Sequence, residues 1–162
     1  MIPGTEGVSG WAVLLELVKI VVPSGLVILG WVVVSKGNDK RETRKETRQF
    51  LDRTISSVEK VRDSALECLL SSDAAVIRKL EASIDPCLKT LEDSLMRLKL
   101  RDDSGVVITA QQVRTAITNN GFYRVANRQA VDCDHRALHD INLQVAVLID
   151  ALEKAYQGTY HK

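Results

Sequence analysis

A long apolar segment, residues 11–34, constrains the fold of this chain more than any other feature. It carries only two formal charges, Glu16 and Lys19, and has Trp11 and Trp31 near its two ends. A membrane hydrocarbon core about 30 Å thick needs roughly 20 helical residues, and tryptophan is enriched at both interfaces. The segment is also about twice as long as the apolar part of a cleaved signal peptide. The sequence therefore predicts one membrane-spanning helix.

The charges on either side of this segment predict its orientation. Residues 1–10 contain no Lys or Arg, whereas six basic residues follow between Lys36 and Arg48. Basic flanks are retained on the cytoplasmic side of a membrane, and they can also contact anionic lipid. We therefore expect the larger part of the chain on the cytoplasmic face, in a membrane such as the bacterial inner membrane. The expected order is a short extracytoplasmic tail (1–10), the transmembrane helix (11–35), a basic juxtamembrane segment (36–49), a cytoplasmic helical bundle (50–158) and a short tail (159–162).

Three residues inside the predicted span are unusual for a simple anchor. Glu16 and Lys19 are three positions apart, so they share a helix face and can form an ion pair. They could reach the nearby outer interface, or they could mediate association between spans or line a wet path. Pro23 removes a helical hydrogen bond near the middle of the span and permits a kink.

The remainder of the sequence predicts an all-α fold, an antiparallel bundle of three long helices and one short helix. Apolar residues recur at spacings of three and four over about residues 38–70, between residue 73 and Leu98, and over 129–157. A break at Gly37 would separate the first of these helices from the span. The predicted seam residues are Ile77, Leu80, Ile84, Cys87, Leu91, Leu95 and Leu98 in the second helix and Leu138, Ile141, Val145, Leu148 and Leu152 in the last.

Local signals place the ends of these helices. Ser71-Ser72-Asp73 offers N-cap residues for the second helix, within which Pro86 could begin a new helix or bend the existing one. The run from Thr109 to Gln112 fits a capping box, and Gly121 follows the expected end of that short helix.

Composition and motifs exclude several classes of activity. A formal net charge of +1 argues against a general nucleic-acid binder. The three cysteines contain no CxxC pair, which indicates reduced thiols rather than a disulfide framework. The sequence contains no P-loop, dinucleotide-binding fingerprint or GxSxG motif, so we expect no cofactor.

One polar cluster could carry chemistry. On a helix, Asp132, His135 and His139 would share a face at metal-ligand spacings, although a solvated polar face has the same pattern. Arg128 and His135 are separated by six residues, and this pair resembles the arginine–histidine pattern of helical ribonuclease domains of the HEPN type. The resemblance covers eight residues and implies a ribonuclease.

These features predict a non-enzymatic, membrane-anchored interaction and assembly module. Its expected partners are membrane lipid and either further copies of the chain or another membrane-associated protein, with no nucleic acid. An oligomeric, membrane-perturbing or pore-forming effector is the first alternative, and Glu16, Lys19 and Pro23 motivate it. A membrane-tethered ribonuclease or metal-binding domain is the second alternative.

Overall fold

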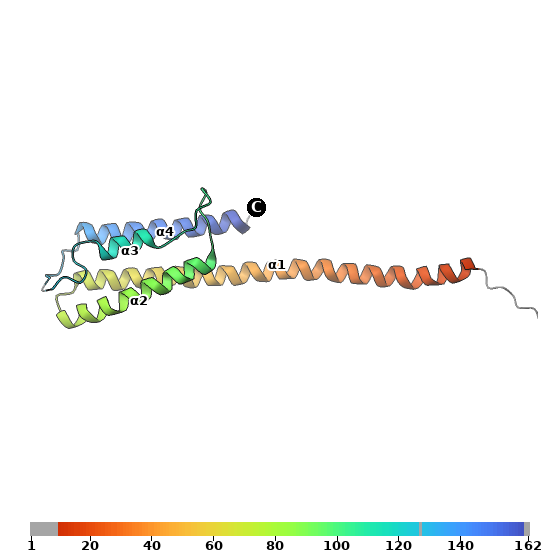
Figure 1. Ribbon diagram of the computed structural model, residues 1–162, viewed down its shortest axis with the longest axis horizontal. Helices are drawn as coiled ribbons and strands as arrows, with labels where there is room; N and C mark the ends of the chain where they lie inside the picture. Colours follow the sequence, from red (N-terminus) through yellow and green to blue (C-terminus); the bar gives the residue numbers. More distant parts are fainter. Residues whose placement is uncertain (1–9, 127, 161–162) are drawn as a thin grey trace, which may run out of the picture. The chain divides into compact units, whose positions relative to one another are not determined.

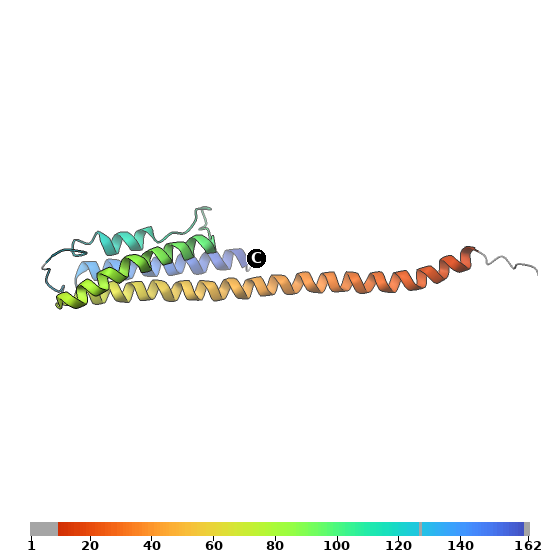
Figure 2. The same cartoon turned by 60° about the horizontal axis from the view of Figure 1, so that its bottom comes forward.

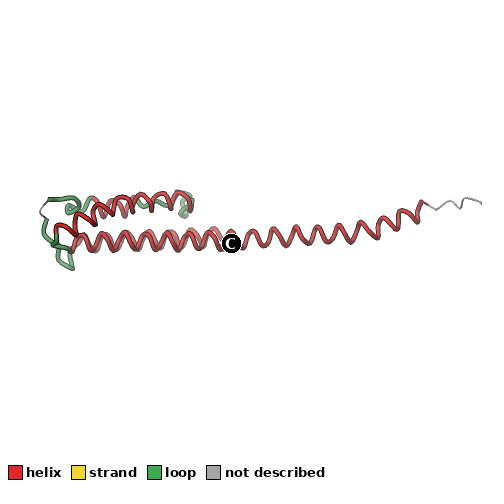
Figure 3. Tube along the Cα trace, turned by 90° about the horizontal axis from the view of Figure 1, so that it is seen from below, coloured by secondary structure: helices red, strands yellow, loops and turns green. Residues whose placement is uncertain are grey.

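Four helices and their connecting loops make up the described part of the chain. The computed structural model describes residues 10–126 and 128–160, and before Arg41 it describes the helical backbone and, of the side chains, only that of Trp31. The helices are α1 (Gly10–Leu70), α2 (Ala74–Leu98), α3 (Gln111–Thr118) and α4 (Arg136–Tyr160). Across the described ranges only helices and loops occur, apart from one isolated bridge between Arg101 and Val107 (Figures 1 and 3). The predicted all-α fold with three long helices and one short helix is confirmed.

The chain divides into two compact units, residues 1–45 and 46–162. In the first unit α1 continues through Gly37 without the predicted break. The side chains of Trp11, Glu16, Lys19 and Pro23 lie outside the described part of the structure, so the predicted span stays a prediction. Among the residues that the structure describes, no helix combines the length and apolar character needed to cross a membrane.

The second unit is an antiparallel bundle. Successive helices from the end of α1 through α2, α3 and α4 reverse direction (Figures 1 and 2). Arg48 on α1 donates to Glu153 on α4 near one end of the bundle. At the other end the Val131 amide, in the segment before α4, donates to the Leu69 carbonyl of α1. Between them lies one apolar core. Its fully buried members include Leu51 and Val58 from α1, Ile84, Leu88 and Leu91 from α2, Val113 and Ile117 from α3, and Ile141, Val145 and Leu152 from α4.

Helix α2 follows its sequence signals closely. Asp73 is the N-cap, and its Oδ1 accepts a hydrogen bond from the Ala75 amide at 2.7 Å. Pro86 lies inside one continuous helix, and its side chain is exposed. The proline lacks an amide donor, but it lies on the solvent side of α2 and not on the side that packs on the core. The predicted seam is wrong at one position, because Cys87 is exposed and Leu88 is buried in its place.

The starts of the last two helices differ from their predictions. Ala110, not Thr109, is the N-cap of α3, and no side chain caps it, so the predicted capping box is wrong. Ala110 is instead fully buried, and packing fixes the start of the helix. Helix α4 begins at Arg136 rather than near Gln129, because the preceding residues turn to contact the end of α1.

Candidate functional site

An arginine from a distant part of the chain caps the C-terminal end of α1. No basic residue lies in the last turn of α1, and its final carbonyls need donors from elsewhere. Arg128 supplies them: its Nη2 donates to the Cys68 carbonyl, and its Nη1 donates to the Leu69 carbonyl at 3.3 Å. The positive charge also complements the negative end of the helix dipole. Arg128 therefore joins the segment before α4 to the end of α1.

A second set of contacts holds this segment against α2. The backbone amide of Arg124 donates to Glu81 Oε1 at 2.8 Å, while the Arg124 side chain donates to Asp85 Oδ2 at 2.5 Å. Arg124 has φ = 57°, a left-handed conformation that is unusual for a residue with a side chain. The Tyr123 hydroxyl donates to Asp85 Oδ1 at 3.0 Å. Burial, together with that hydrogen bond, raises the pKa of Tyr123 to about 12, so the phenol remains a donor at neutral pH.

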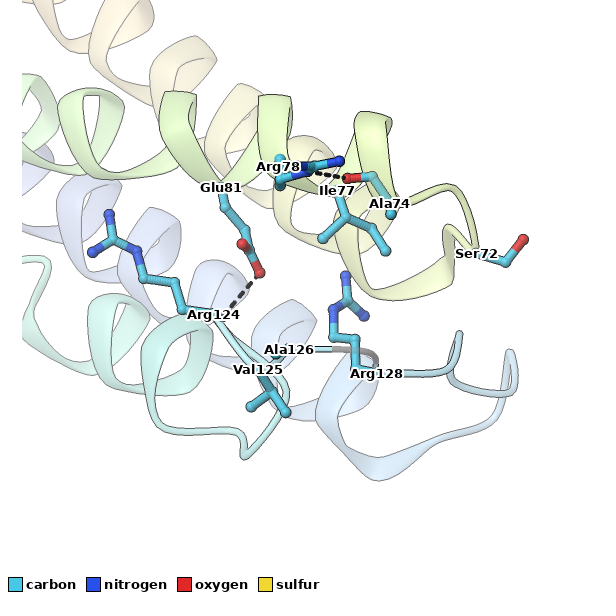
Figure 4. Close-up of a pocket in the computed structure, with 9 residues that line it drawn as sticks. All are labelled: Ser72, Ala74, Ile77, Arg78, Glu81, Arg124, Val125, Ala126 and Arg128. Atoms are coloured by element: carbon cyan, nitrogen blue, oxygen red, sulfur yellow. Dashed lines mark hydrogen bonds between the residues drawn. The ribbon is translucent and has the colours of Figure 1, made fainter.

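These contacts border a cavity of about 460 Å³ between the start of α2 and residues 124–126 and 128. Figure 4 shows Arg78 and Glu81 on α2 and Arg124 and Arg128 on the facing segment. Three arginines and one glutamate line the cavity, and even with Arg124 paired to Asp85 its net charge is positive. Ile77 and Val125 add apolar surface. Within the limits of the described residues, the buried Nε of Arg128 has no hydrogen-bond partner.

The residues predicted as metal ligands do not form a metal site. Asp132 lies in the turn before α4, and its carbonyl accepts from the His135 amide at 3.0 Å, so the predicted common helix face does not exist. His135 Nδ1 accepts from the Ala137 amide at 3.1 Å, which leaves that nitrogen occupied, while His139 is exposed on α4. Nowhere in residues 10–126 and 128–160 could three or more His, Cys, Asp or Glu residues together hold a metal ion.

Arg128 and His135, the two residues that carry the HEPN resemblance, border different cavities. Arg128 borders the cavity beside α2, whereas His135 borders a different cavity of about 310 Å³ between α3 and the start of α4. The His135 ring packs edge to face on Phe122, with 5.0 Å between ring centroids. Arg128 therefore contacts the end of α1, and His135 contacts Phe122. Sequence spacing alone could not reveal the role of Arg128, because its partners lie about 60 residues earlier.

The cysteines differ in their surroundings. Cys68 is buried beside Arg128, with 3.2 Å between its Sγ and Arg128 Nη2, whereas Cys87 and Cys133 are exposed. Burial raises the pKa of the Cys68 thiol, and the nearby Arg128 charge only partly opposes this effect. Cys68 is therefore a packed thiol and not an activated nucleophile.

The outward face of α4 forms a separate surface, which sequence analysis of the buried seam did not single out. Leu143 and Val147 lie one turn apart and are each 47% exposed. Charged residues continue the same face in both directions at spacings of four and three. We call this set the α4 stripe: Arg136, Asp140, Leu143, Val147, Asp150 and Lys154.

Comparison with known proteins gives no assignment for either surface: no protein-family model, curated protein or solved structure matches this chain significantly.

Proposed function

We propose that this chain is a membrane-anchored, non-enzymatic helical module that assembles with further copies of itself on the cytoplasmic face of a membrane. The anchor is the apolar segment 11–34, and the basic residues that follow it give the orientation. Trp31 supports this placement, since its side chain is 72% exposed and indole rings favour a membrane interface. Tethering copies in one plane raises their effective concentration, so even a weak contact can produce assembly.

The α4 stripe is the observation that carries the assembly part of the proposal. The inner face of α4 already buries its own apolar residues, among them Ile141, Val145 and Leu152, in the core of the bundle. Leu143 and Val147 are therefore not needed to complete that core. Two large apolar side chains on adjacent turns of one exposed helix face provide a small contact surface for a second helix.

Charge along the stripe favours a second copy as the partner. If two α4 helices pair in antiparallel fashion about Leu143, residues seven positions before and after it face each other across the interface. Arg136 of one copy then lies opposite Asp150 of the other, and the same ion pair occurs twice by symmetry. The Arg136 side chain is 89% exposed and holds Asp140 only loosely, with 3.5 Å between Nε and Oδ2. It is therefore available for such a contact.

The first test is the mass of the full chain in nanodiscs or detergent, measured by light scattering and corrected for bound amphiphile. We expect an oligomer for the parent protein and a smaller species for the double variant Leu143→Glu, Val147→Glu, because burying the new carboxylates would be costly. Met96→Glu is the matched control, since Met96 is exposed on α2 outside the stripe. A monomeric parent protein, or equal effects of the control and the double variant, would contradict self-assembly through α4.

A charge exchange tests the pairing itself. Arg136→Asp and Asp150→Arg should each weaken the oligomer, because each variant places like charges opposite one another. The two changes together restore opposite charges and should restore the oligomer. Failure of the double variant to recover would exclude the arrangement about Leu143.

The anchor is tested separately. Membranes from cells that produce the full chain should retain it after alkaline carbonate extraction, and a reporter fused after Lys162 should be active only in the cytoplasm. Release by carbonate would refute the anchor, and activity of the reporter outside the cytoplasm would refute the orientation.

A further inference from the structure

We infer that the cavity between the start of α2 and residues 124–126 and 128 binds a small phosphate-bearing molecule. The cavity has a volume of about 460 Å³, within the range of about 300–1,000 Å³ that is usual for small-molecule sites. This inference is independent of assembly through α4, because the cavity and the α4 stripe share no residue.

The net positive charge of the residues that line the cavity favours an anionic ligand. Arg78, Arg124 and Arg128 come from two separate stretches of chain and border one cavity, with Glu81 as the acidic residue in the lining. Glu81 Oε1 accepts from the Arg124 amide, and the Arg124 guanidinium is paired with Asp85, so Arg78 and Arg128 outnumber this one carboxylate. Guanidinium groups offer several donors in a planar fork that matches phosphate oxygens.

Free donor capacity remains in Arg78 and Arg128, whereas the Arg124 guanidinium is paired with Asp85. Arg78 donates through its Nε to the Ala74 carbonyl of its own helix at 3.1 Å, and its two terminal nitrogens can turn toward a ligand in the cavity. The buried Nε of Arg128 lacks a partner within the described part of the chain. A buried donor without a partner is costly, so Arg128 has donor capacity that its own contacts do not use.

The remaining lining suits the organic part of such a molecule. Ile77 and Val125 border the same cavity, and the Val125 side chain is 47% exposed. A ligand that carries a phosphate and a compact apolar or planar body would cover this surface while its phosphate lies against the arginines. A nucleoside monophosphate has this chemistry.

The test uses the full chain in detergent with two probes, adenosine monophosphate and inorganic pyrophosphate, and with adenosine as the uncharged control. Isothermal titration should show binding of at least one phosphate probe and no binding of adenosine. Raising the salt concentration should weaken that binding, because screening acts on the arginine–phosphate attraction. Absence of binding by both phosphate probes would overturn the inference, and so would equal binding of adenosine.

A matched pair of variants locates the site. Arg78→Gln should weaken phosphate binding by about tenfold or more, since it removes a charge-assisted hydrogen bond to the ligand. Lys79→Gln removes one positive charge from the adjacent exposed position, which does not line the cavity, and should leave the affinity nearly unchanged. Thermal unfolding of both variants verifies that the fold is retained. Equal losses in the two variants would show that phosphate responds to general surface charge and would refute the site.

Discussion

Removal of the Arg128 side chain should loosen the end of α1. In Arg128→Ala the Cys68 carbonyl loses its donor, whereas the Leu69 carbonyl keeps the amide of Val131 at 3.1 Å. A hydrogen bond to a charged group contributes about 1.5–3 kcal/mol. A cation at a helix C-terminus adds about 0.3–1 kcal/mol. Both figures include part of the same attraction between the guanidinium and the helix carbonyls, so they do not add in full. The expected cost of Arg128→Ala for local opening of the α1 end is about 2–3 kcal/mol.

Cys68 reports this opening directly, because its side chain is only 3% exposed. The assay measures labelling of Cys68 by a thiol reagent under native conditions, in a background in which the exposed Cys87 and Cys133 are replaced by Ser. If the site closes faster than it reacts, the rate follows the population of the open form. A cost of about 2–3 kcal/mol corresponds to labelling roughly 30 to 150 times faster.

Two further variants make this result specific. Arg136→Ala removes an arginine whose side chain is 89% exposed, and it should change the labelling rate by less than about threefold. Arg128→Lys keeps the cation without the planar fork of donors, so it should give an intermediate rate. The reasoning is refuted if Arg128→Ala labels no faster than Arg136→Ala.

Three other predictions follow from the bundle. Leu88→Ala should lower the free energy of unfolding by about 2–5 kcal/mol, whereas Cys87→Ala should change it by less than about 0.5 kcal/mol, as measured by urea denaturation. Tyr123→Phe should flatten the pH dependence of stability between pH 10 and about 12, because the parent protein holds the phenolic proton more tightly when folded and loses stability as pH rises through that range. A double-mutant cycle on the Glu92–Arg114 pair, whose Oε1 and Nε are 2.7 Å apart, should give a coupling of about 0.2–1 kcal/mol that falls with added salt.

Local sequence signals were sufficient for α2 because its boundaries depend on nearby residues. The Asp73 side chain caps the helix by accepting from an amide only two residues along the chain, and the apolar spacing identifies Ile84, Leu91 and Leu95 as residues of one face. The error at Cys87 arose because two neighbouring positions fit the spacing after Ile84. A step of four residues to Leu88 places the larger apolar side chain in the core.

The segment before α4 could not be predicted in the same way. Residues near Gln129 have helical periodicity, but their neighbours Arg128 and Val131 donate to carbonyls at the end of α1. Those contacts join positions about 60 residues apart, and no local pattern encodes them. The candidate cavity depends on the same long-range arrangement, so its arginines looked unrelated in the sequence. The α4 stripe was visible as a set of residues, but only the packed bundle distinguishes its exposed Leu143 from the buried Ile141.

The late position of Arg128 has a consequence for biosynthesis. A ribosome releases all of α1 and α2 before the residues that close the end of α1 and cover its apolar face. Arg128 follows Cys68 by 60 positions, and Glu153 follows its partner Arg48 by 105. Throughout that interval the nascent chain exposes the apolar faces of α1 and α2 to chaperones and proteases. A product terminated before Arg136 would keep those faces exposed, so quality control should remove truncated chains efficiently.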